Sequence, residues 1–259
     1  MEGVLRIRVI LSAIVLLAAS AATASLSAEV EFMGFSRDGT CAAMLERWFN
    51  DGSGAPSARL TVLSTVTGDP VWMEEVVWPE SRLVEIEHSF MDIHSSVNPA
   101  GDSLLTLARG FLDSLGIGYG EPLVHCVCHP MTDRGVDPDM ALFVQCVMSP
   151  SYMTPEMKLE LIEDPCELED PPVWLSMFDP PVLLTVTVTG EDGTILFCES
   201  DLDRQPEADL YAGQRFVSDY RIRDVYMMDR SIAVVLDALE PGFEGPDGMH
   251  RLVTGTLGN

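Results

Sequence analysis

Positive charge is scarce in this sequence, which contains 15 lysine and arginine residues against 41 aspartate and glutamate residues and has a formal net charge of −26 at pH 7. A chain with so few cations repels phosphate backbones at ordinary salt, so the composition argues against nucleic acid as a partner. It favours a solvated acidic surface. It would also suit a cationic partner, such as an envelope protein or a divalent cation, and calcium binding stays open as an alternative.

The short motifs that mark common catalytic sites are also absent. The chain has no phosphate-binding glycine loop and no zincin motif. Gly52–Gly54 lies between two expected strands, whereas a nucleophile elbow joins a strand to a helix. Carboxylates such as Asp201 and those of Glu167–Asp170 are expected to be solvated, and single histidines such as His250 to be structural. We therefore assign no catalytic residue and expect no cofactor.

Long apolar runs are missing after the first segment of the chain. Two arginines precede the apolar run Val9–Ala22, and the small-residue pattern Ala22-Thr23-Ala24 fits a signal peptidase site. The run is shorter than the roughly 20 residues that span a bilayer, so we expect residues 1–24 to be a cleaved signal peptide and not an anchor. The mature protein is expected to be secreted or periplasmic, with no membrane span after signal cleavage.

Cysteine is infrequent but even in number. The six cysteines are Cys41, Cys126, Cys128, Cys146, Cys166 and Cys198. In an oxidising compartment an even number favours disulfide bonds. A chain of this length can fold without them, so buried thiols remain an alternative. We expect Cys146 to pair with Cys126 or Cys128 from a neighbouring strand.

Residues 125–129 contain the densest group of metal-ligand types, namely His125, Cys126, Cys128 and His129. In an extended strand the two cysteines share one face and the two histidines the other, so the four side chains cannot all reach one ion. Structural zinc sites usually draw two ligand pairs from separate places, often with two residues between paired cysteines. A disulfide or buried thiols are therefore favoured, with metal binding and redox chemistry as alternatives.

Alternating apolar residues and turn signals predict many short strands. They are expected at Val30–Phe35, Cys41–Phe49, Arg59–Thr65, Val71–Val77, Leu123–His129, Ala141–Val147, Val182–Thr189, Thr194–Glu199, Arg221–Met227, Ile232–Leu239 and Met249–Leu257. The strands at Leu123–His129 and Ala141–Val147, fifth and sixth in this order, are expected to pair with each other.

Two segments instead have helical spacing. Asn98–Gly116 predicts a helix with an asparagine cap, a proline in the first turn and an apolar face that includes Leu104 and Leu107. A shorter helix is expected from Thr154 to Glu163. The element order predicts a β-rich α+β fold, with antiparallel sheets in blade-like meanders and one main amphipathic helix. Residues 25–259 are expected to form one domain, with two possible halves at 29–120 and 121–259.

Two stretches, Val30–Val62 and Ile222–Thr254, have the same order of strand, tight turn, strand, glycine-rich loop and strand. Each resembles a blade of a β-propeller. A closed propeller needs about four blades or more, so a complete propeller is not expected. We interpret the two units as halves of one β-rich core, with the Asn98–Gly116 helix packed between or against them.

The glycine-rich loops of these two units are the candidate interaction surfaces. The residues concerned are Asp51, Gly52 and Gly54 in the first loop, and Gly242, Phe243, Glu244 and Gly245 in the second. If the units pack as related halves, the loops occupy equivalent corners. Phe243 is either exposed for a partner or folded back over the end of the sheet, and its flanking glycines favour the second arrangement.

The turn Phe35-Ser36-Arg37-Asp38-Gly39 resembles the corresponding turn of WD-type propeller blades, although Arg37 stands where proline is common. A longer resemblance includes this turn, Asp51–Gly54, the helix, the Val182–Thr189 hairpin and the string Gly-Phe-Glu-Gly-Pro-Asp that ends at Asp247. In this order the chain resembles a bacterial family of predicted secreted proteins that share domain of unknown function 2259. The resemblance implies export and no established activity.

These observations favour an exported, non-enzymatic binding or envelope-associated module. The alternative is a secreted hydrolase or metal-dependent enzyme that uses acidic residues or the His125–His129 cluster. The sequence names neither a ligand nor a substrate.

Overall fold

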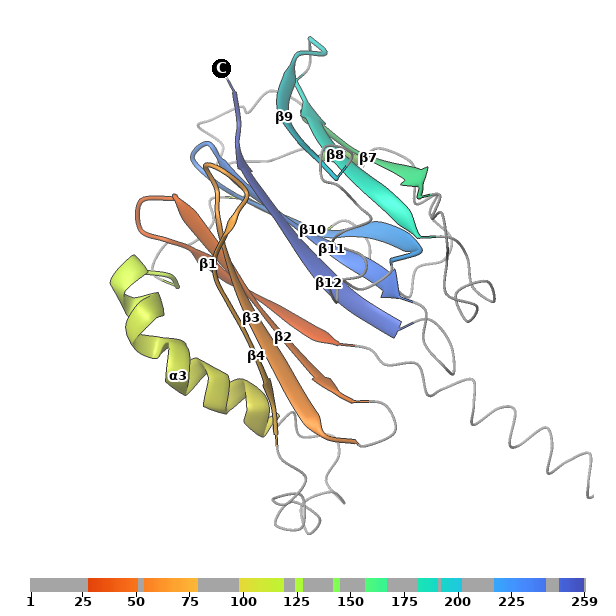
Figure 1. The fold of residues 1–259 in the computed structure, drawn as a ribbon. Helices are drawn as coiled ribbons and strands as arrows, with labels where there is room; N and C mark the ends of the chain where they lie inside the picture. The colour runs from red at the N-terminus through yellow and green to blue at the C-terminus, as the bar shows by residue number, and fades with distance from the viewer. Residues whose placement is uncertain are drawn as a thin grey trace, which may run out of the picture.

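The computed structural model describes residues 28–50, 54–78, 98–118, 124–127, 142–144, 157–166, 181–190, 192–201, 217–240 and 247–258. Within these residues the fold is a stack of three four-stranded antiparallel sheets, with one helix on the outer face of the first sheet (Figure 1). The prediction of a β-rich α+β fold that is not a closed propeller is confirmed.

The first sheet is a meander in the order β1-β2-β3-β4. Its strands are β1 (Glu29–Phe35), β2 (Cys41–Phe49), β3 (Pro56–Ser64) and β4 (Pro70–Val77). Gly39 takes the positive φ of 72° that the β1–β2 turn requires. Hydrogen bonds from Ser36 and Thr40 hold the pKa of Asp38 at about 2. The charged Asp38 side chain therefore closes this turn by accepting hydrogen bonds from its neighbours.

The second sheet has the order β12-β11-β10-β5, and the third has the order β6-β7-β8-β9. Their strands are β5 (Val124–Val127), β6 (Leu142–Val144), β7 (Met157–Pro165), β8 (Val182–Thr189), β9 (Ile195–Ser200), β10 (Asp219–Met228), β11 (Ser231–Glu240) and β12 (Asp247–Thr256). The predicted hairpin of β8 and β9 and the predicted meander of β10, β11 and β12 are confirmed.

Two predictions about the middle of the chain are wrong. The segment from Thr154 to Glu163 was predicted as a short helix, but β7 occupies Met157–Pro165 and pairs with β8. Leu159 and Leu161 are buried while Ile162 is exposed, and this alternation outweighs the helix-start signal before it.

The expected pairing of the fifth and sixth strands is also wrong. β5 pairs with β10 in the second sheet, whereas β6 pairs with β7 in the third. The two strands therefore belong to different sheets, and they are not the neighbours on which the proposed pairing of Cys146 with Cys126 or Cys128 depended. Which strand pairs with which depends on how distant segments pack. Nearness in the sequence alone therefore did not predict these two partners.

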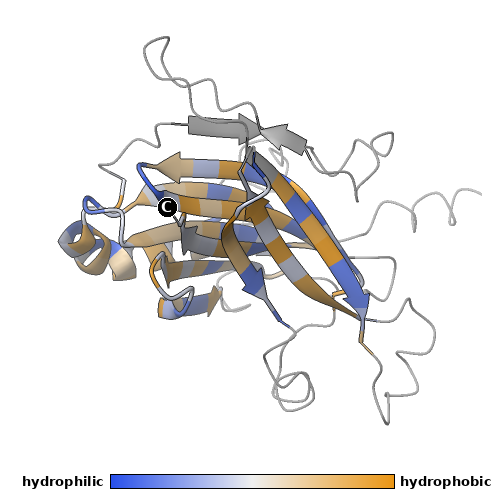
Figure 2. Cartoon of the chain, turned by 90° about the horizontal axis from the view of Figure 1, so that it is seen from above, coloured by the Kyte–Doolittle hydropathy of each residue, from blue (hydrophilic) through white to orange (hydrophobic). Residues whose placement is uncertain are grey.

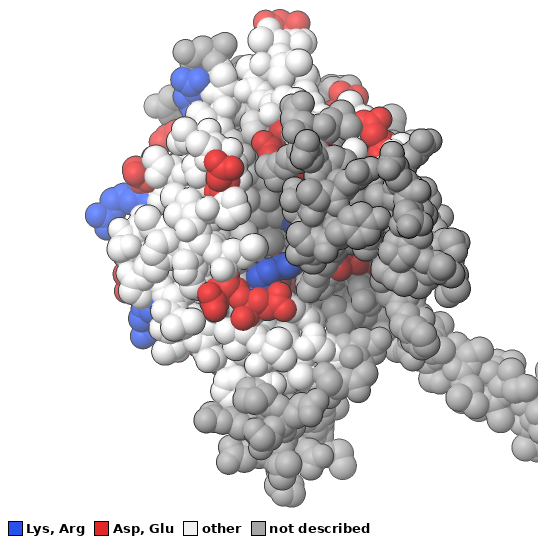
Figure 3. All heavy atoms as spheres, in the orientation of Figure 1, with Lys and Arg blue, Asp and Glu red and all other residues white. Residues whose placement is uncertain are grey.

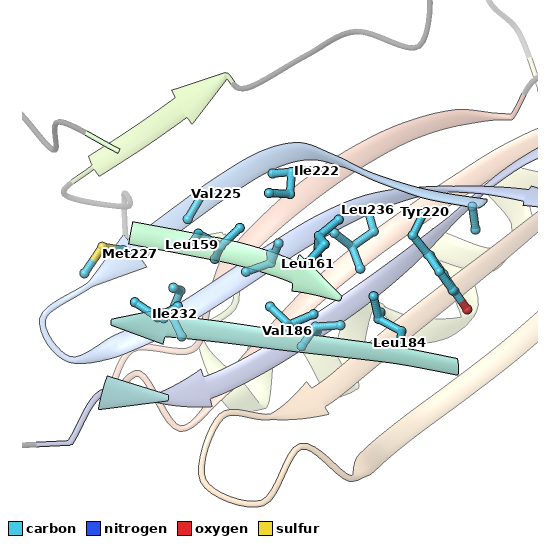
Figure 4. Close-up of a cluster of buried hydrophobic side chains, with 14 of the residues drawn as sticks. Leu159, Leu161, Leu184, Val186, Tyr220, Ile222, Val225, Met227, Ile232 and Leu236 are labelled. Atoms are coloured by element: carbon cyan, nitrogen blue, oxygen red, sulfur yellow. The ribbon is translucent and has the colours of Figure 1, made fainter. Parts of the chain in front are cut away.

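The second sheet lies in the middle of the stack and buries both faces. Toward the first sheet it contributes Met228, Ala233, Val235 and Leu252, which pack against Phe35, Ala42, Met44 and Leu63. Toward the third sheet, Ile222, Val225, Ile232 and Leu236 face Leu159, Leu161, Leu184 and Val186 (Figure 4). Figure 2 shows the matching alternation of apolar and polar positions along the strands. Strands of the two blade-like units, Val30–Val62 and Ile222–Thr254, thus pack against each other in one buried cluster.

The predicted helix is confirmed as α3 (Pro99–Leu115). The side chain of Asn98 accepts hydrogen bonds from the N–H groups of Ala100 and Gly101, and Gly116 ends the helix with a φ of 67°. α3 packs against β2, β3 and β4, on the face of the first sheet that points away from the second (Figure 1). Leu107, expected on the apolar face, is instead 65% exposed. No helix of the described residues is long and apolar enough to cross a bilayer.

Candidate functional site

A network of charged side chains lies between the first and second sheets. Its centre is Glu46 on β2, whose side chain is fully buried. Arg59 on β3 donates to Glu46 Oε2 from Nε at 2.9 Å and from Nη2 at 2.6 Å. The backbone N–H of His250 on β12 donates to Glu46 Oε1 at 2.8 Å. One carboxylate therefore links two strands of the first sheet to the edge of the second.

The His250 ring lies between two buried carboxylates. Its Nδ1 is 3.5 Å from Glu46 Oε1, and its Nε2 is 3.3 Å from Asp237 Oδ1. Arg223 Nη1 is also 3.3 Å from Asp237 Oδ1. Burial by itself would lower the pKa of His250, but the Asp237 and Glu46 carboxylates together hold it above its usual value of 6.5. The 3.5 Å contact is an ion pair and is longer than a good hydrogen bond.

The net charge of the network depends on the protonation state of His250, whose Nε2 lies 3.3 Å from Arg223 Nη1 as well as from Asp237. Glu46, Asp237 and Asp224 supply three carboxylates, and Arg59 and Arg223 supply two guanidinium groups. An imidazolium brings the sum to zero. Burial by itself would raise the pKa of Glu46, but the nearby His250 ring and the charge of Arg59 hold it below the usual value.

We expect this ring to make folding stability depend on pH above neutrality. Because the folded-state pKa of His250 is raised, its stabilising contribution is complete below the unfolded value near 6.5 and is lost as the pH rises through the folded value. The melting temperature of the wild type, followed from pH 6 to 9, should fall more steeply than that of His250→Asn, which keeps all the other histidines. Parallel profiles for the two proteins would show that His250 does not carry this dependence.

A cavity of about 220 Å³ lies beside the network, where the three sheets meet. Its walls come from β2, β3 and β4 of the first sheet, from β12 of the second and from β9 of the third; the lining residues used below are Met44, Leu63, Met73, Glu199, Leu252 and Thr254. We call this cavity the β4–β12 groove. Figure 3 shows that acidic side chains outnumber basic ones on the described part of the face turned to the viewer.

Of the four predicted metal ligands, only the backbones of His125 and Cys126 belong to the described residues. The structure places the backbones of His125 and Cys126 in β5, opposite Tyr226 and Val225 of β10. The side chains of these two residues, and Cys128 and His129 entirely, lie outside the described part. In that part, no three His, Cys, Asp or Glu side chains gather so as to hold a metal ion.

The candidate interaction loops are described only at Gly54, which has a φ of 65° and open space around its Cα. Asp51, Gly52, Gly242, Phe243, Glu244 and Gly245 lie outside the described residues. Trp48 near the end of β2, just before the first loop, packs with Met249 near the start of β12, just after the second loop. The equivalence of the two corners stays a prediction, because most of both loops lies outside the described residues.

Sequence reasoning missed the buried network and one further ion pair. Asp201 was expected to be solvated, but its side chain is only 15% exposed and accepts two hydrogen bonds from Arg251, at 2.6 and 2.7 Å. The expectation of solvation is therefore wrong for this residue. The sequence did contain a usable signal for the network, because Glu46 directly follows the apolar run Cys41–Leu45 and Asp237 interrupts the apolar run of β11. A charge in such a position needs a buried partner.

Comparison of the chain with protein-family models and with curated proteins finds no match to either.

Proposed function

We propose that the mature chain is an exported, non-enzymatic binding module and that the β4–β12 groove is its binding site. The observation that carries this proposal is that the charged groups beside the groove bond to each other. Arg59 directs two N–H groups at Glu46, and the second oxygen of Glu46 accepts from His250. A catalytic site needs such groups to converge on an open position where a reacting atom can sit. Here they bond to each other and stiffen the wall of a cavity.

Two features of the sequence support export. Residues 1–24 have the pattern of a cleaved signal peptide. The order of turn, loops and helix resembles the family of predicted secreted proteins with domain of unknown function 2259.

The test is to follow the backbone amides of the groove by NMR while fractions of a cell-envelope extract are added to the mature protein. We expect the amide signals of Leu252 and Thr254 to shift reversibly, and the bound material to be recovered chemically unchanged. Met73→Trp, which places a larger side chain in the groove, should weaken the shifts. No shift at these amides with any fraction would refute the groove as the binding site.

Two other results would favour an enzyme. Recovery of cleaved or modified material after binding would indicate a hydrolase. Stoichiometric zinc in protein purified without chelator, lost on Cys126→Ser, would assign the His125–His129 cluster to a metal site and replace the non-enzymatic account. Both measurements use the same preparation of mature protein.

A further inference from the structure

The β4–β12 groove lies along the edge of β12. Its lining includes four consecutive residues of this strand, Arg251, Leu252, Val253 and Thr254. Successive side chains of a strand point to opposite faces, so a cavity on one face would be lined by every second residue. Leu252 packs toward the first sheet, whereas Val253 packs toward the third. Contact with all four residues therefore places the cavity at the strand edge, between the two outer sheets.

The main chain of β12 shows which groups point toward this edge. Within the described residues β12 pairs with β11 alone. The N–H of Leu257 donates to the carbonyl of Arg230 at the end of β11, so odd-numbered residues direct their main-chain groups toward β11. The N–H of Gly258 points the other way and donates to the carbonyl of Leu196 on β9. Even-numbered residues of β12 therefore direct their N–H and C=O groups toward the groove.

Leu252 and Thr254 hold main-chain groups that need a partner. Their outward N–H and C=O groups make no hydrogen bond with any residue in the part of the chain that the structure describes. Both residues are nevertheless buried, with 5% and 2% of their surface exposed. A buried N–H or C=O without a partner is costly. The edge therefore favours a ligand that brings both an acceptor and a donor.

The charged side chains that line the groove already have partners. The pairs are Arg59 with Glu46, Arg251 with Asp201, and the His250 ring with Glu46 and Asp237. Glu199 has an interaction partner as well. A charged ligand would lose its hydration and meet no unpaired opposite charge among the described lining residues. The groove therefore favours an uncharged ligand.

The size of the groove and its apolar wall limit the ligand to about one amino-acid residue. A cavity of about 150 Å³ holds benzene, and the groove is somewhat larger, with a volume of about 220 Å³. Met44, Leu63 and Leu252 belong to one buried apolar cluster beside it. Met73 also lines the groove, although its side chain is 59% exposed. One apolar side chain of a ligand would remove this surface from water.

We propose that the β4–β12 groove binds a small uncharged compound that contains one peptide-like unit, with an apolar side chain between two amide groups. The N–H and C=O of this unit exchange two hydrogen bonds with Leu252, as in a hydrogen-bonded pair of antiparallel strands. Residues paired in this way point their side chains to the same face, so the apolar side chain lies on Leu63 and Met73. This inference rests on the proposed function, because it names the ligand class of the same groove.

The probe is N-acetyl-leucine methylamide, titrated into the mature protein and followed by NMR through the amide signals of Leu252 and Thr254. We expect saturable shifts with a Kd of about 1 mM, as is usual for so small a ligand. A methyl group on the leucine nitrogen removes the donor to the Leu252 carbonyl and should weaken binding about tenfold. A second methyl group on the terminal amide nitrogen, which points away from β12, should change Kd less than about twofold. Equal effects of the two methyl groups would overturn the paired hydrogen bonds.

Three further analogues test the charge and the side chain of the ligand. N-acetyl-leucine carries a free carboxylate and leucine methylamide a free ammonium group, and each should bind about fivefold more weakly than the uncharged probe, or weaker still. N-acetyl-glycine methylamide lacks the apolar side chain and should not shift the two signals. Tighter binding of either charged analogue, or equal binding of the glycine compound, would contradict the proposed ligand class.

A matched pair of protein variants tests the location. Met73→Ala removes most of an exposed side chain from the apolar wall and should weaken binding of the probe about fivefold. Leu107→Ala shortens a similarly exposed apolar side chain on α3, on the other side of the first sheet, and should leave Kd unchanged. An equal loss in both variants, or no loss in Met73→Ala, would show that the probe binds elsewhere.

The failure of this inference can be told from the failure of the proposed function. If the probe does not bind but envelope fractions shift the amides of Leu252 and Thr254, the groove is a binding site for another ligand and only the ligand class falls. If the probe binds and shifts these amides, both proposals are supported. If neither the probe nor any fraction shifts them, both are refuted.

Discussion

Replacing Glu46 with alanine should lower the free energy of unfolding by about 3–5 kcal/mol, because it leaves buried charges without their partner. Arg59 would lose both of its hydrogen bonds to the carboxylate, and the backbone N–H of His250 would lose its acceptor. The change should appear as a lower midpoint of urea unfolding with a similar slope. Since the same carboxylate joins β2, β3 and β12, the loss should weaken the contact between the first two sheets.

A matched control separates this buried pair from an ordinary surface pair. Glu31→Ala removes a carboxylate that lies 2.9 Å from Arg47 and is 54% exposed, and it should cost less than about 1 kcal/mol. Glu46→Ala and Arg59→Ala should also be strongly non-additive when combined, because the second change removes the charge that the first leaves unpaired. Similar losses for Glu46→Ala and Glu31→Ala would mean that the network between the sheets contributes little.

Much of the fold was predictable because its local signals agree with its tertiary packing. The alternation in β1 to β4 and in β10 to β12, together with the caps of α3 at Asn98 and Gly116, specified these elements with small errors at their ends. β7 was missed because the segment that begins at Thr154 has a local helix-start signal. Pairing with β8 and burial of Leu159 and Leu161 are interactions with distant residues, and they decide its structure instead.

The candidate site was less predictable because it depends on how the sheets stack. Glu46 and Asp237 could have been singled out as charges in apolar strands, but nothing in the sequence shows that His250 lies between them. Within the described residues, the place of β12 at the edge of the second sheet follows from the order of its strands. That order depends on β5 joining β10 on the opposite side, and sequence reasoning paired β5 with β6. Because the partner of β5 was predicted wrongly, the position of β12 at the edge of its sheet could not be predicted either.

The same stacking explains why two blade-like units do not need a propeller. The two blade-like units, Val30–Val62 and Ile222–Thr254, bury their facing surfaces in one cluster that includes Phe35, Met44 and Leu252. The outer face of the first unit is covered by α3, and that of the second by the third sheet. Each sheet therefore buries its apolar face in the stack. Closing the sheets into a ring, as a propeller does, is not needed to protect them.

Replacing Gly255 with alanine should destabilise the protein by about 1–3 kcal/mol or more, because the second and third sheets approach closely at this residue. A Cβ atom on Gly255 would lie 2.0 Å from Cε2 of Phe197 on β9 and 2.3 Å from its Cδ2. No side chain tolerates such a contact, so the ring or the strand must move. Glycine inside a strand often marks a close approach of this kind, and here it permits β9 to pack on β12.

Two variants make this prediction specific. Gly255→Ala combined with Phe197→Ala should be more stable than the sum of the two single losses predicts, since removing the ring makes room for the new methyl group. Gly110→Ala makes the same substitution inside α3, where a Cβ would meet nothing within 4 Å, and should stabilise the protein by about 0.5–1 kcal/mol. If thermal and urea unfolding show Gly255→Ala to be as harmless as Gly110→Ala, the third sheet does not pack on β12 through this contact. The docking of β9 beside the groove, on which the placement of Glu199 depends, would then be wrong as well.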